Sequence, residues 1–86
     1  MTNLYRRAAA ILPGEGQLSL AHIKLVGNTL LEVENHQGVI AYSAQQVQLS
    51  LKESILVVTG EDLEIQRLDR EVIHLNGRID NLRFGQ

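Results

Sequence analysis

The stretch VQLSLKESILVV, residues 47–58, decides the fold class of this 86-residue chain. In its first half the apolar residues Val47, Leu49 and Leu51 occupy every second position, which is the period of a half-buried β-strand. Polar residues follow, and the unbroken apolar run 55–58 then predicts a central strand that is covered on both faces. Two strand signals so close together indicate a sheet.

The same period of two runs through the preceding residues and predicts two hairpins. Gly27-Asn28 is a turn signal between a strand that contains Ile23 and a strand in which Leu31 and Val33 alternate with glutamates. The next four residues, Asn35 to Gly38, have an Asx residue first and a glycine last, as a type I turn prefers. A hairpin closed there would set Val33 opposite Ile40 on one face of the sheet.

The last third of the chain predicts one turn and one long, bent strand. Residues 60–62 (Gly-Glu-Asp) carry the turn signal, and alternation resumes after them. Asn76-Gly77 is a strong hairpin signal, but a turn there would place Leu75 opposite Arg78. We therefore predict a continuous strand from Val72 to Phe84, bent at Gly77, with a bulge near Asp80-Asn81 that corrects the parity of the apolar residues.

The N-terminus has a different period. Five apolar residues recur at helical spacing, which predicts a short amphipathic helix that ends at Pro13-Gly14: Leu4, Tyr5, Ala8, Ile11 and Leu12. Such a helix is too short to be stable alone, so it docks on the β domain as a lid, on a partner, or on lipid headgroups.

These patterns predict an all-β protein, a compact antiparallel β-sandwich or small barrel of about seven short strands with a short N-terminal amphipathic helix. The predicted domains are residues 1–16, the helix and linker, and residues 17–86, the β domain. Apolar residues make up 44% of the chain and aromatic residues only 3%, so Leu, Ile and Val must build the core. No internal repeat is apparent.

Composition excludes several classes of function. There is no cysteine for a disulfide framework or thiolate metal site, and a net charge of −2 provides no basic field for nucleic acid. No apolar run approaches the roughly 20 residues that span a bilayer, and the N-terminus lacks the apolar core of a signal peptide. We therefore expect a cytoplasmic protein.

The sequence predicts no catalytic, cofactor-binding or metal-binding residue. His22, His36 and His74 lie in separate predicted elements without the paired spacing of metal ligands. The acidic group around residues 61–64 is typical of an ordinary turn, because calcium loops need more oxygen ligands in a set order. No serine lies in a Gly-x-Ser-x-Gly turn, and Gly14-Glu15-Gly16 precedes a strand rather than a helix. We predict that the protein is not an enzyme.

Several stretches taken in order resemble the YabP/YqfC family of sporulation proteins, over residues 22–84. They are IKLVGN (23–28), VENHQGVI (33–40) with Tyr42, VVTGEDLEI (57–65), LNGRI (75–79) and LRF (82–84). The turn from Glu34 to Gly38 is similar to the YqfC branch. The resemblance implies a spore-forming Gram-positive bacterium, a role in endospore development and a β domain with no known catalytic residues. It also implies a membrane-anchored sporulation protein as partner, so the expected location is cytoplasmic and peripheral to a membrane through that partner.

The expected function is thus a small scaffold or assembly factor that binds a protein partner. The alternative is a free-standing β module that binds a peptide or a glycan, although a glycan binder would need aromatic platforms and the few aromatic residues are scattered. We expect the partner to pair with the edge of the C-terminal strand, Val72 to Phe84. Arg78, Asp80 and Arg83 on that strand would fix the register.

Overall fold

The computed structural model describes residues 20–85, and the predicted all-β class is confirmed for this part of the chain. The predicted N-terminal helix and the linker to Gly16 lie outside the described residues. The structure contains a single antiparallel sheet with the strand order β1-β2-β6-β5-β4-β3. Its six strands are β1 (His22–Val26), β2 (Leu30–Glu34), β3 (Gly38–Tyr42), β4 (Gln46–Ser50), β5 (Ile55–Leu68) and β6 (Val72–Gly85).

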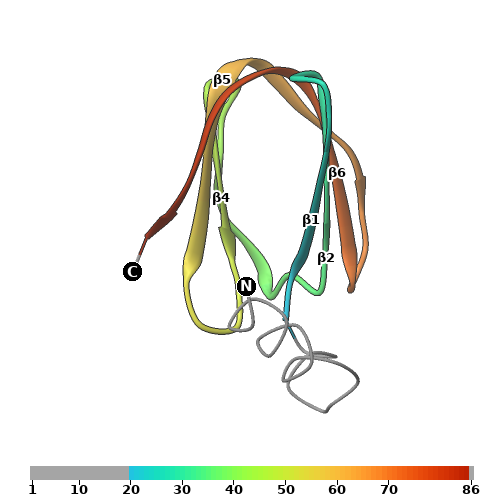
Figure 1. Ribbon diagram of the computed structural model, residues 1–86, viewed down its shortest axis with the longest axis vertical. Coiled ribbons are helices and arrows are strands. Elements are labelled where there is room, and N and C mark those ends of the chain that lie inside the picture. The colour runs from blue at the N-terminus through green and yellow to red at the C-terminus, as the bar shows by residue number, and fades with distance from the viewer. Residues whose placement is uncertain (1–19, 86) are drawn as a thin grey trace, which may run out of the picture.

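The two long strands fold this sheet on itself. Figure 1 shows an arch, with β4 in one leg, β1 and β2 in the other, and β5 and β6 running over the top. In the first layer, β1 and β2 lie beside residues 72–76 of β6. In the second layer, β3 and β4 lie beside residues 55–59 of β5. One sheet thereby supplies both walls of the core.

The bend of β5 and β6 contains the bulge that the parity of β6 predicted. Thr59 pairs with Asn81 and Gly60 with Ile79, so Asp80 is the extra residue, and the prediction of one continuous bent strand is confirmed. The predicted turn at residues 60–62 is wrong, because β5 continues through it by bulging. This continuation is why residues 20–85 form six strands rather than seven.

The predicted hairpin over Asn35 to Gly38 is also wrong. Val33 pairs with Ile23 and Ile73 instead of with Ile40, and β3 pairs with β4. The segment between β2 and β3 crosses from one layer to the other, and its main chain bonds to the β5–β6 turn: the Asn35 amide donates to the Glu71 carbonyl (2.6 Å). The residues Asn35 to Gly38 suit a hairpin turn and a connection between layers equally well. The pairing of β2 with β6 decided between these two paths. The hairpin at Gly27-Asn28 is confirmed.

The core lies between the layers and consists of Leu, Ile and Val, as the composition predicted. Among residues 20–85, eleven apolar side chains are buried: Leu31, Val33, Val47, Leu49, Leu56, Val57, Val58, Leu63, Ile73, Leu75 and Ile79. Residues 56–58 are all among them, which confirms that 55–58 is a central strand covered on both faces.

The two halves of the sheet are related by an approximate two-fold repeat that the sequence does not reveal. The β1–β2 hairpin packs beside β6 as the β3–β4 hairpin packs beside β5. The Ile79 amide donates to the Asn28 carbonyl (2.7 Å) in the first hairpin turn, and the Leu63 amide donates to the Ala44 carbonyl (2.8 Å) in the second. The fold therefore presents the same kind of surface twice.

Candidate functional site

Folding one sheet into two layers leaves two seams where an edge of one layer faces an edge of the other. The β1/β6 seam lies between β1 and residues 79–85 of β6, and the β3/β5 seam lies between β3 and residues 63–68 of β5. Within residues 20–85, β1 pairs only with β2, and residues 79–85 of β6 pair only with β5. Strand edges of this kind can accept a further strand.

The β3/β5 seam is bridged by a side chain. The Tyr42 hydroxyl on β3 donates a hydrogen bond to the Leu63 carbonyl oxygen on β5, at 3.2 Å. The bond ties the edge of the second layer to the edge of the first.

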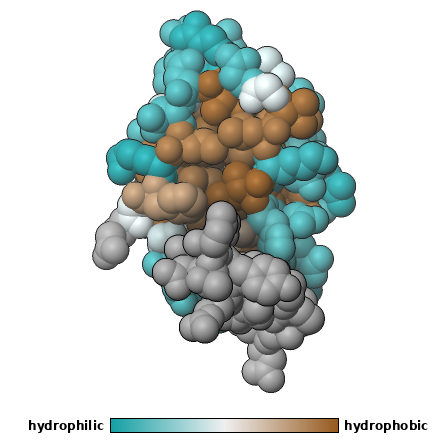
Figure 2. Space-filling model, in the orientation of Figure 1, coloured by the Kyte–Doolittle hydropathy of each residue, from teal (hydrophilic) through white to brown (hydrophobic). Residues whose placement is uncertain are grey.

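The β1/β6 seam is an apolar groove with two hollows of about 260 Å³ each. One lies near the bend, where Leu25 faces Ile79 and Leu82. The other lies at the far end and is lined by Leu20, Ala21, Ile23 and Leu51, with Phe84 and the β4–β5 turn. Figure 2 shows this apolar surface between the two legs, flanked by hydrophilic side chains.

Large apolar side chains are exposed along this groove. Leu25 is 45% exposed and Phe84 63% exposed, although Phe84 pairs with the buried Leu56 of β5. Scattered exposed apolar residues are normal on soluble proteins, but a continuous apolar strip beside a strand edge is typical of an interaction site. The groove is therefore the candidate site.

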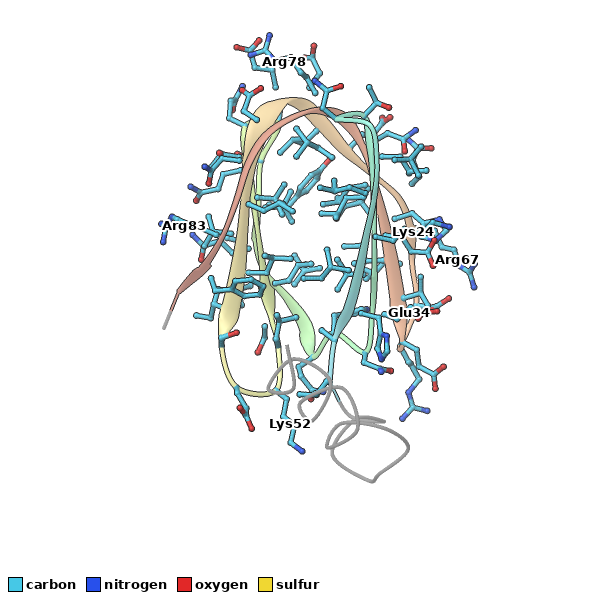
Figure 3. The ribbon with its side chains drawn as sticks, in the orientation of Figure 1. Lys24, Glu34, Lys52, Arg67, Arg78 and Arg83 are labelled. Atoms are coloured by element: carbon cyan, nitrogen blue, oxygen red, sulfur yellow. The ribbon has the colours of Figure 1, made fainter. Side chains whose placement is uncertain are left out.

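The predicted site residues separate into two places. Arg78 and Asp80 come together at the bend, where Arg78 Nε lies 3.0 Å from Asp80 Oδ1 and Arg78 Nη2 lies 3.1 Å from Glu61 Oε2. The hydrogen bond with Asp80 and the two nearby carboxylates raise the pKa of Arg78. Arg83 lies apart from them on the leg of the second layer (Figure 3).

The prediction that all of Val72 to Phe84 is an edge strand is wrong for its first half. Residues 72–76 pair with β2 as well as with β5, so only the second half of β6 borders a seam. Alternation showed which faces of β6 are apolar, but it does not show which strand lies alongside.

Sequence reasoning missed the residues that make the seam, Leu25 and Leu82 on its walls and Lys24 on its rim. Their alternation predicts strands, but no local signal shows that these two strands face one another. Lys24 and Arg83 form no ion pair within residues 20–85.

The three histidines occupy separate places in the described part of the chain. The Gly38 amide donates to His36 Nδ1 (3.0 Å), so the ring hydrogen lies on Nε2, which donates to the Asp69 carbonyl (2.9 Å). His74 faces Glu32 at 3.5 Å, and His22 is exposed on β1. No group of three or more metal-ligating side chains gathers within residues 20–85.

Comparison with known proteins identifies the family of this chain. A model of the YabP family matches residues 17–86. The chain belongs to the YabP family. An uncharacterized Bacillus subtilis (strain 168) protein, YqfC, is 32% identical over 73 residues, which cover 85% of this chain and 78% of that protein. The resemblance predicted from the sequence motifs is confirmed, and membership in the YabP family suggests a sporulation-associated protein. Among the described residues no helix is long and apolar enough to cross a membrane.

Proposed function

We propose that this YabP-family protein is a non-catalytic scaffold or assembly factor of endospore development that binds a membrane-anchored sporulation protein from the cytoplasmic side. The observation that carries the proposal is the β1/β6 seam, where a strand edge and an apolar groove lie side by side. Main-chain hydrogen bonds along an edge supply affinity, and the groove beside them supplies specificity. A surface of this kind suits a protein that holds a partner.

Arg78, Asp80 and Arg83 contribute differently to such an edge. Arg78 forms ion pairs with both Asp80 and Glu61, so this group shapes the bend at the head of the seam. Arg83 is the cation that a partner meets. Exposed charges of this kind change the rate and selectivity of association more than its final affinity.

A free-standing module that binds a soluble peptide is the second candidate, because the same edge serves it. A glycan is disfavoured, since the aromatic residues in the described part are far apart: Tyr42 bridges the β3/β5 seam while Phe84 lines the β1/β6 seam. The two candidates differ in whether the bound protein is anchored in a membrane.

The test is affinity capture by the tagged full chain from a whole detergent lysate of sporulating cells, which contains both soluble and membrane proteins, at low salt. Arg83→Glu is compared with Arg70→Glu, a charge reversal in the exposed β5–β6 turn away from the seam. We expect a membrane-anchored protein to copurify with the wild type and with Arg70→Glu. We expect a smaller amount of that protein to copurify with Arg83→Glu. Equal capture by both variants would remove the seam from the proposal, and capture of soluble proteins alone would favour the second candidate.

A further inference from the structure

The two seams differ at one pair of equivalent residues. Leu25 pairs with Leu31 on β2, and Tyr42 pairs with Val47 on β4. Leu31 and Val47 are both fully buried and hold equivalent places in the two-fold repeat, so Leu25 and Tyr42 are equivalent too. Tyr42 reaches the carbonyl of Leu63.

Leu25 stands opposite Ile79, the counterpart of Leu63, but its side chain carries no group that can donate to a carbonyl. Within the described residues, the hydroxyl bridge of the β3/β5 seam therefore has no counterpart at the β1/β6 seam. One seam of the fold is bridged by its own side chain, and the other holds the two apolar hollows.

We propose that the β1/β6 seam receives an extended segment of a partner protein, which adds as a strand beside residues 81–85 of β6. The side chains of this partner segment alternate between apolar and acidic. This inference rests on the proposed function and names the kind of segment that is bound. Successive side chains of a strand point to opposite faces, so one set enters the groove and the other set faces solvent.

The inner set must be apolar because the groove is. Leu25, Leu82 and Phe84 line it, and a polar side chain inserted among them would lose its hydrogen bonds to water. An apolar side chain entering there removes from water both its own surface and that of the exposed Phe84.

The outer set should be acidic because the outer face of residues 81–85 carries a cation, Arg83, that forms no ion pair within residues 20–85. Arg83 on one rim pairs in register with the apolar Val57, so its nearest cross-strand neighbour offers no carboxylate. Lys24 lies on the other leg of the arch, opposite Glu32, so it does not face a strand added beside β6 (Figure 3). Opposite charges on directly paired strand positions attract one another, so an acidic residue of the added strand fits beside Arg83.

The test uses the isotope-labelled full chain and two synthetic peptides, one of four Glu-Val repeats and one of four Lys-Val repeats. We expect the Glu-Val peptide to shift the amide signals of Leu25 and of residues 81–85 and to slow their hydrogen exchange. Arg83→Glu should lower the affinity for the Glu-Val peptide about fivefold and raise the affinity for the Lys-Val peptide, because an exposed ion pair contributes up to about 1 kcal/mol.

Leu25→Tyr places at the β1/β6 seam the residue that bridges the other seam. This variant should bind the Glu-Val peptide about tenfold more weakly, as expected when a central apolar contact is replaced. Its thermal midpoint should match that of the wild type, because Leu25 lies on an exposed edge. Leu68→Tyr, an exposed apolar position on the β5 side of the other seam, is the matched control and should bind as the wild type does.

Equal binding of both peptides, or shifts confined to the β3/β5 seam, would overturn the inference. Seam amides already protected in the free monomer would show that residues 1–19 of the chain fill the groove, and a doubled mass with protected seam amides would show a second copy there. Either result would also overturn it. If neither peptide binds although the membrane partner is captured through Arg83, the proposed function stands and this inference fails.

Discussion

Gly77 on β6 packs directly against the main chain of Asp62 on β5. A Cβ built on Gly77 would lie 2.5 Å from the Asp62 carbonyl oxygen, and Gly77 has a φ of 132°. Gly60 on the other long strand would likewise place a Cβ against the Arg78 carbonyl. The two long strands can therefore cross and bend only where both lack side chains.

Gly77→Ala should destabilise the fold by about 2 kcal/mol or more, because it combines a disfavoured φ with a main-chain collision. Chemical denaturation of the two proteins measures the loss. Gly85→Ala is the control, since the nearest atom to its added Cβ is 3.5 Å away and belongs to the flexible Arg83 side chain. Similar stabilities of the two variants would show that the bend does not depend on Gly77.

Val57→Asp should destabilise the domain by about 2 kcal/mol or more, because a carboxylate at a buried site loses its hydration and the cross-strand neighbour Arg83 offsets only part of that loss. Val57 is 4% exposed and lies on the outer face of β5, between Gln48 and Arg83, rather than in the central cluster. Val57→Thr keeps the shape and serves as the control. A Val57→Asp protein with an unchanged thermal midpoint would mean that this outer face is not covered.

Gly38→Val should cost about 1 kcal/mol or more, since Gly38 has a φ of 129°. Nothing lies within 4 Å of a Cβ built there, so the cost comes from the backbone alone. Gly38→Ala should therefore cost nearly as much as Gly38→Val. A much larger cost for valine, measured by thermal unfolding, would point to a steric cause instead.

Asp69→Asn should make the fold less sensitive to acid. Hydrogen bonds from the Val72 and Glu71 amides hold the pKa of Asp69 below its ordinary value of 3.8. A carboxylate with a lowered pKa stabilises the fold above that value, and this contribution is lost as the pH falls through the pKa of the folded state. The difference in thermal midpoint between wild type and variant should thus shrink below about pH 4. A constant difference from pH 6 to pH 2 would contradict this role.

The sequence was sufficient for those features that depend on neighbours along the chain. Alternation identified the strand at residues 47–51 and the buried run 55–58, the parity of the apolar residues in β6 revealed its bulge near Asp80, and Gly77 marked its bend. These features can be read locally because the order of residues along one strand fixes which face each side chain takes. A one-residue shift would move every apolar side chain to the wrong face.

The choice of strand neighbours, and with it the candidate site, was decided only by the tertiary structure. Asn35 to Gly38 has the residues of a hairpin turn yet joins two layers, and the alternation of β6 is the same whether β2 or solvent lies beside it. Leu25 and Leu82 became opposite walls of one groove because β5 and β6 fold the sheet over. Side-chain pattern specifies which face of each strand is buried, whereas pairing between distant strands depends on which edges the whole folded chain brings together.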